Sequence, residues 1–229
     1  MKSIMPQKSA IANMYSKFAE KYTIYLFDRE KELKTDCTVM DMAEDTARAM
    51  KELGLSNACI TGASQGGMIA LYLAAYHPEL VYKAVIAGSA SRCTDHSKVT
   101  FQRWIRYAEK KDIRSLIADF CKILYTDNFC SQFQDSIIAA NMDATEHDLK
   151  HFIILCQACI DFDFYNELDA IKRPLLVLGA DKDTVFGPNA SVEIAEKTGC
   201  QSYIYKNYKH AVYDEAPDFL QRMLDFFAS

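Results

Sequence analysis

Three of the eight glycines in the chain fall within six residues of one another, around Ser64. Residues 62–66 read GASQG and fit the pattern G-x-S-x-G. A short, mostly apolar run at 57–61 predicts a buried strand, and the apolar run at 68–76 predicts a buried helix. Ser64 is therefore expected on a sharp turn between a strand and a helix, where its hydroxyl is lifted clear of the sheet and can act as a nucleophile.

The turn around Ser64 restricts which residues can stand beside the serine. Gly62 and Gly66 are expected to be essential because a side chain at either position would collide with the adjoining strand or helix. The helix N-terminus supplies backbone N–H groups and the positive end of a dipole for the negative oxygen that forms when a hydroxyl attacks a carbonyl. The alternative interpretation is a Gly-Ser turn that only caps a helix.

A serine hydroxyl needs a base to remove its proton. Four of the five histidines have structural explanations, one before a proline and three in polar helical surroundings: His77, His96, His147 and His151. His210 instead follows an expected strand at 202–205 after a short polar loop, directly before the last expected helix. A histidine there can point over the sheet towards Ser64, although a surface loop histidine remains the alternative.

The imidazole in turn needs a carboxylate that fixes its tautomer and stabilises its cation. Asp181 and Asp183 both follow an expected strand at 174–178. Asp183, which precedes Val185 and Phe186, is the better placed of the two, with Asp181 as its rival. Either aspartate could instead cap a turn, because aspartate is common in turns.

Along its length the chain alternates between strand-like and helical patterns. Strands are expected at 22–27, 57–61, 84–87, 174–178 and 202–205, and helices at 9–20, 42–53, 68–76, 191–197 and 217–227. Continuous apolar strands that alternate with helices predict an α/β fold with a mostly parallel sheet flanked by helices. Residues 91–169 break this rhythm and predict a helical cap insertion, so that 1–90 and 170–229 form the core.

At this point the sequence resembles the α/β-hydrolase family over nearly its whole length. The matching stretches are YTIYLFDR, DMAEDTARAMKELGL, ITGASQGGMIALYLAAYHPELV, AVIAGSAS, PLLVLGADKDTVFGP and YKHAVYDEAPDF, in the family's order. The resemblance implies a serine hydrolase for an ester or related acyl bond of a small molecule. Ser64 would be the nucleophile, Asp183 the acid, His210 the base and the Gln65 N–H one oxyanion donor, with no cofactor and no metal.

The chain departs from the family at its start. The resemblance implies further strands before residue 22 and a His-Gly loop that supplies a second oxyanion N–H, and neither is found. Residues 1–20 resemble the end of that loop and the next helix, so a reading frame begun too late, or a truncated and weak enzyme, is expected. The sheet should then have about five strands, with an exposed edge beside 22–27, and residues 1–6 are the remaining candidate for a second donor.

Two other functions compete. A binding protein that keeps the pocket but has lost turnover is the first. The second is a short-chain dehydrogenase, because the turn resembles TGxxxGxG and residues 205–209 supply YxxxK. Met68 stands in place of the third glycine, and no acidic residue follows at the spacing expected for ribose binding.

Composition excludes several classes of partner. A net charge of −5 offers no basic surface for nucleic acid, and no apolar run is long enough to span a membrane. The N-terminus has no apolar signal-peptide core. Eight scattered cysteines include one close pair, Cys156 and Cys159, without the two further ligands of a zinc site. A reduced, cytoplasmic protein is expected, and the sequence does not indicate an oligomeric state.

Overall fold

The computed structural model describes residues 8–229 and contains one four-stranded parallel sheet. Its strands lie in the order of the chain: β1 (Ala58–Ala63), β2 (Val81–Ala87), β3 (Leu175–Ala180) and β4 (Gln201–Tyr205). All three pairings are parallel, so each strand returns to the sheet through a helical connection. The expected parallel α/β architecture is confirmed.

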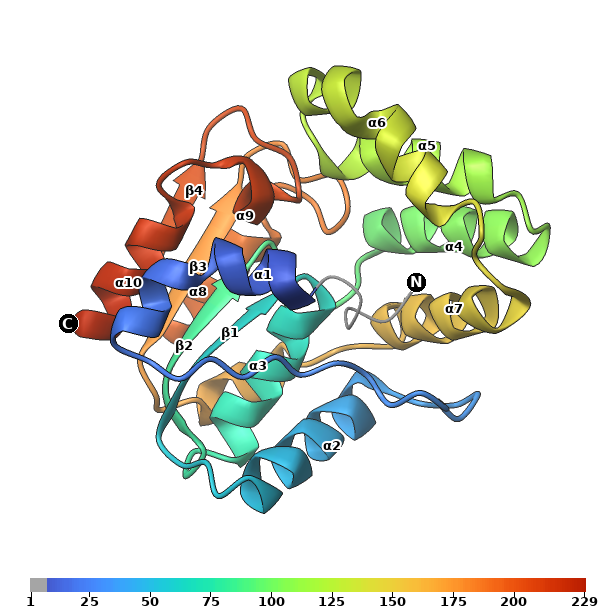
Figure 1. Ribbon diagram of the computed structural model, residues 1–229. Coiled ribbons are helices and arrows are strands. Elements are labelled where there is room, and N and C mark those ends of the chain that lie inside the picture. Colours follow the sequence, from blue (N-terminus) through green and yellow to red (C-terminus); the bar gives the residue numbers. More distant parts are fainter. Residues whose placement is uncertain (1–7) are drawn as a thin grey trace.

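Helices cover both faces of the sheet (Figure 1). One face carries α2 (Val39–Glu52), α3 (Gln65–Tyr76) and α8 (Ala190–Thr198), and the other carries η2 (Ser16–Glu20), α9 (Val212–Glu215) and α10 (Phe219–Ala228). Alternate side chains of β2 point to opposite faces, Ala84 and Ile86 to the first and Val85 and Ala87 to the second. Both faces of the inner strands are therefore buried, which explains their uninterrupted apolar sequences.

The expected helices are present with shifted ends. The one expected at 9–20 is two elements, α1 (Lys8–Met14) and η2. Helix α2 begins three residues before the expected start because Thr38 and Asp41 form a capping box, in which each side chain accepts from the backbone N–H of the other. The sequence pattern found the apolar face of α2 but not this polar start.

The strand expected at 22–27 is absent, so the prediction of about five strands is wrong. This segment is extended, but it takes part in no strand pairing within residues 8–229, and β1 is left as the edge of the sheet. Its aromatic and β-branched residues fit a strand. A strand also needs a neighbour to bond with, and no described segment lies between 22–27 and β1 to supply one.

An open groove of about 690 Å³ separates the 22–27 segment from β1. Its walls include residues 22–27 on one side and 58–61 on the other, with α3 and α10 above and below. Ile24, Tyr25 and Leu26 remain exposed along it. An exposed apolar edge of this kind is expected to favour self-association.

Four long helices lie between β2 and β3 in the chain: α4 (Asp95–Glu109), α5 (Ile113–Leu124), α6 (Asp127–Asn141) and α7 (Glu146–Ile160), followed by η3 (Asn166–Ala170). In Figure 1, α4 to α7 form a separate group to the right of the sheet. None of the four strands falls within residues 91–169. Helix α6 buries a single residue, Ile138.

Candidate active site

Ser64 lies between the end of β1 and the first residue of α3. Its φ of 55° and ψ of −123° are strained for a residue with a side chain, as expected from the strand–GASQG–helix context. The turn is held by the Ser64 N–H, which donates to Ala87 O at 2.9 Å, and by Ser89 Oγ, which donates to Ser64 O at 2.7 Å. The backbone of the turn is therefore fixed in this conformation.

Of the three glycines at the Ser64 turn, Gly62 and Gly67 are required by close contacts. A Cβ on Gly62 would lie 2.0 Å from Gly66 O, and one on Gly67 would lie 2.5 Å from the Cβ of Ser89. A Cβ on Gly66 would meet nothing within 4 Å, because this residue faces the open groove. The expectation of a collision is therefore right for Gly62 and wrong for Gly66, whose place is taken by Gly67.

The structure brings Asp183 and His210 together. Asp183 Oδ2 lies 2.8 Å from His210 Nδ1, and because a carboxylate only accepts, Nδ1 carries the hydrogen. This tautomer leaves Nε2 free to take a proton. Asp181 lies elsewhere, where its Oδ1 accepts from the Asn207 N–H at 2.8 Å. Asp183, not Asp181, is the partner of the imidazole.

Asp183 is held as a carboxylate. Its side chain is almost completely buried, with 3% of the residue exposed, and burial by itself would raise its pKa. The charge and hydrogen bond of His210, together with the N–H groups of Val185 and Phe186 on Oδ1, outweigh burial and lower the pKa of Asp183 below its ordinary value. The site therefore keeps a negative charge next to the ring that would become a cation.

Ser64 and His210 adjoin the same stretch of backbone at the end of β2. Ser64 bonds to Ala87, and the next residue, Gly88, has a φ of +46° with the His210 carbonyl so close that a Cβ would lie 2.7 Å from it. The loops that carry the serine and the histidine therefore converge at one end of the parallel sheet, beyond the carboxyl ends of its strands. Ligands bind at this end in open α/β sheets.

Gln65 links the turn to the helical region 91–169. Its Nε2 donates to Leu155 O at 2.9 Å and to Cys159 Sγ at 3.2 Å, and its Oε1 accepts from Arg29 Nε at 3.3 Å. No acceptor for the Gln65 backbone N–H is found among residues 8–229. Residues 1–6, the other expected donor segment, lie outside the described part of the chain.

Several contacts of the site were not predicted from sequence. Arg29 bonds to the Gln65 side chain, and Asp214 accepts from the Tyr125 hydroxyl at 2.9 Å. Lys209 and Glu215 reach the helical region as well. No local sequence pattern identifies Arg29, Asp214 or Glu215 as part of the site. Lys209 could have been suspected only because it precedes His210.

Two features are absent from residues 8–229. Within residues 8–229, no three His, Cys, Asp or Glu side chains are grouped as a metal would require. None of the helices in that range has the length and apolarity needed to cross a bilayer.

The 690 Å³ groove reaches Gly66 in the turn, and Arg29 also lines it. Its lining does not include Ser64, Asp183 or His210.

Comparison with known proteins agrees with this geometry. Residues 15–217 match the family described as alpha/beta hydrolase fold. A provisionally assigned carbamate hydrolase, RutD, of Caulobacter sp. (strain K31) is 28% identical over 167 residues, which are 70% of this chain but 60% of that protein. The chain thus spans less than two thirds of that relative's length.

Two other proteins extend the comparison over more of the chain. The 3-oxoadipate enol-lactonase 1 of Acinetobacter baylyi is 22% identical over 218 residues, 91% of this chain and 80% of that protein. Among solved structures, MGS-M2, an alpha/beta hydrolase enzyme from a deep-sea metagenome library, superposes with a TM-score of 0.84 at 20% identity and covers 95% of this chain and 85% of its own.

Proposed function

The chain belongs to the alpha/beta hydrolase fold family, and on this basis we propose that it is a serine hydrolase with Ser64, His210 and Asp183 as its catalytic triad. Family membership disfavours the dehydrogenase interpretation. The observation that carries the proposal is the 2.8 Å contact of Asp183 with His210 Nδ1, on a loop that converges with the strained Ser64 turn. The relatives named for carbamate and enol-lactone hydrolysis support this reaction class.

In the proposed reaction, Ser64 Oγ attacks the carbonyl carbon of an ester or related acyl bond of a small molecule. His210 Nε2 takes the hydroxyl proton, and the Asp183 carboxylate stabilises the imidazolium. The Gln65 N–H donates to the carbonyl oxygen as it becomes negative. His210 then gives its proton to the leaving group, and water, activated by the same imidazole, releases the acyl group from Ser64.

The domain assignment belongs to this proposal. Residues 1–90 and 170–229 form the hydrolase core, and 91–169 form a cap that shapes the substrate pocket. Four helices between β2 and β3, joined to the Ser64 turn through Gln65, support it. A cytoplasmic location is also proposed, on the ground that all eight cysteines are free thiols.

A fluorophosphonate probe tests the proposal, because it reacts only with a serine that a base activates. We expect one adduct per chain, located at Ser64 by peptide mass spectrometry. Ser64→Ala should remove labelling, and His210→Ala should slow it about 10⁴-fold. Ser131→Ala is a suitable control, since Ser131 is exposed on α6 and its Oγ donates to Asn128 O within the same helix.

The alternative is a hydrolase-like binding protein without turnover. It draws support from the burial of His210, of which 1% is exposed, because a working base must meet its substrate. A folded protein that stays unlabelled at Ser64, yet shows saturable binding of a small ester, would favour this alternative.

A further inference from the structure

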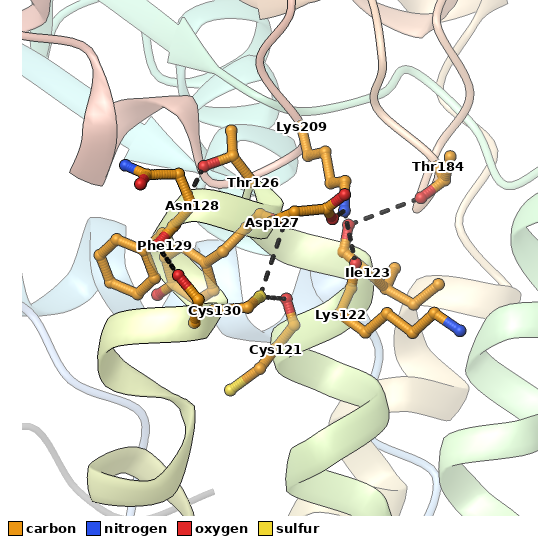
Figure 2. A network of polar contacts seen from close by, with 12 residues as sticks. Cys121, Lys122, Ile123, Thr126, Asp127, Asn128, Phe129, Cys130, Thr184 and Lys209 are labelled. Carbon is orange, nitrogen blue, oxygen red and sulfur yellow. Dashed lines mark hydrogen bonds and ion pairs between the residues drawn. The ribbon is translucent and has the colours of Figure 1, made fainter.

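Three consecutive carbonyl groups in the last turn of α5 accept hydrogen bonds from the loops that carry Asp183 and His210. Lys122 O accepts from Lys209 Nζ at 3.0 Å, and Ile123 O accepts from Thr184 Oγ1 at 3.5 Å. A third bond, of 2.9 Å, runs from the Ala211 N–H to Leu124 O. Figure 2 shows Thr184 and Lys209 both reaching the end of this helix.

The end of a helix is suited to this role. Its last carbonyls have no partner within the helix and carry the negative end of the helix dipole. Lys209 brings an ammonium group to that position and also pairs with Asp127 Oδ1 at 2.9 Å, at the start of α6. With 22% of its side chain exposed, Lys209 is held between α5 and α6 rather than free in solvent.

The start of α6 binds the same loop from its other side. Both carboxylate oxygens of Glu215 accept from Thr126, Oε1 from the backbone N–H at 3.1 Å and Oε2 from the hydroxyl at 2.6 Å. A carboxylate is favoured there by the positive end of the α6 dipole. The His210 loop is thus fixed on both sides of the histidine, at Lys209 and at Glu215.

These contacts fall on the immediate chain neighbours of the proposed acid and base. Thr184 follows Asp183, while Lys209 and Ala211 flank His210. The Phe186 ring, two residues beyond Thr184, adds an apolar contact, since its centroid lies 5.4 Å from that of His210. The α5–α6 junction, defined here as residues 122–127, therefore holds both loops in one arrangement.

We propose that Lys209 and Glu215 are positioning residues: by tying the His210 loop to the α5–α6 junction, they hold the imidazole in register with Asp183 and Ser64. The inference rests on the proposed triad. It makes the helical region part of the scaffold of the site as well as a cover for substrate. Displacement of a reacting group by about 1 Å costs about 10²-fold in rate, so a loosened junction acts on turnover more than on binding.

The test compares Lys209→Met with Lys206→Met. Both residues lie on the loop after β4, but 76% of the Lys206 side chain is exposed and its Nζ lies 3.9 Å from the Asp181 carboxylate. Lys206→Met should therefore leave kcat unchanged. For Lys209→Met we expect kcat for p-nitrophenyl acetate to fall by about 10²-fold with KM changed less than threefold. Lys209→Arg, which keeps the charge and reach, should restore most of kcat, and Glu215→Ala should reproduce the loss.

A second readout does not depend on turnover. A hydrogen shared between His210 Nδ1 and Asp183 should give a low-field proton resonance, which is expected in the wild type and in Lys206→Met but broadened or lost in Lys209→Met. If Lys209→Met keeps both the resonance and the wild-type kcat, the positioning role is wrong while the triad stands. If the wild type lacks fluorophosphonate labelling, the proposed function is wrong, and the resonance alone then decides whether Lys209 orders the pair.

Discussion

On the β4 side of the sheet, the loops after β3 and β4 are bonded to the end of α5, whereas on the β1 side the 22–27 segment runs along a groove without pairing to the edge strand. The first side is closed by polar contacts of defined geometry. The second is lined mainly by apolar side chains and leaves backbone groups of β1 unpaired among the described residues. Both sides meet at the turn around Ser64, which has Gly67 against the sheet and Gly66 on the groove.

The two sides contribute different properties to the molecule. Directional hydrogen bonds fix the positions of side chains, so their loss should lower the reaction rate. An apolar edge fixes no side chain in this way, and substitutions there should change solubility and local stability. Substitutions on the closed side should therefore change rates, and those on the open side should leave rates nearly unchanged.

The largest effect is expected at the centre of the closed side. Asp183→Asn should lower kcat by about 10⁴-fold, because the neutral amide no longer stabilises the imidazolium or selects its tautomer. Steady-state hydrolysis of an activated ester measures the change. Asp181→Asn is the matched control and should stay close to wild type, because Asp181 bonds to Asn207 instead of His210. A larger loss in Asp181→Asn than in Asp183→Asn would reverse the assignment.

Adjacent glycines allow the two sides to be compared directly in stability. Gly67→Ala should lower the free energy of unfolding by about 1–3 kcal/mol, because its Cβ would overlap Ser89 and the surrounding backbone must shift. Gly66→Ala should be neutral or stabilising by up to about 1 kcal/mol, since alanine favours the helix and meets no neighbour. Urea denaturation of the two variants gives both values. Equal losses would mean that the groove is not open at Gly66.

Acidification should reduce the contribution of Asp183 to the free energy of unfolding. The pKa of Asp183 is lower in the folded chain than in the unfolded one, so its stabilising effect is complete above the unfolded value, about 3.9, and is lost as the pH falls through the folded value. The difference in unfolding free energy between wild type and Asp183→Asn should therefore shrink as the pH is lowered below about 4. Denaturation curves at a series of pH values measure it. A difference that is constant with pH would contradict the assignment of the shift to this pair.

The smallest effect on the fold is expected on the open side. Tyr25→Lys places a charge on the exposed apolar segment beside β1 and should reduce self-association, with the unfolding free energy changed by less than about 0.5 kcal/mol. Light scattering at increasing concentration provides the measurement. Val99→Lys, at an exposed position of α4, adds the same charge far from the groove and should have little effect. Equal improvement from both would show that net charge, not the edge, governs solubility.

The sequence predicted what depends on local pattern. The inner strands β2 and β3 are buried on both faces, so their continuous apolar runs identify them. The Ser64 turn is equally local, because strand, glycines and helix are contiguous. The preference for Asp183 as the neighbour of His210 agrees with the 2.8 Å contact between them, and the Val185 and Phe186 beside which it was placed donate their N–H groups to its carboxylate.

The remaining features depend on contacts between distant segments. Residues 22–27 have the composition of a strand, but pairing requires a partner whose position the local sequence does not encode. Lys209 and Glu215 acquire their contacts only because α5 and α6 end and begin beside the His210 loop. An exposed lysine and an exposed glutamate would have the same sequence pattern. Such residues are recognised only once the helical region has been placed on the core.

The free edge of β1 also determines how the amide hydrogens of this strand exchange with solvent. The N–H groups of Ala58 and Ser64 donate to residues of the β2 segment, so even-numbered amides point into the sheet and odd-numbered ones towards the groove. In deuterated water, protection should therefore alternate residue by residue along a single strand. The rapidly exchanging amides should be those of Cys59, Thr61 and Ala63.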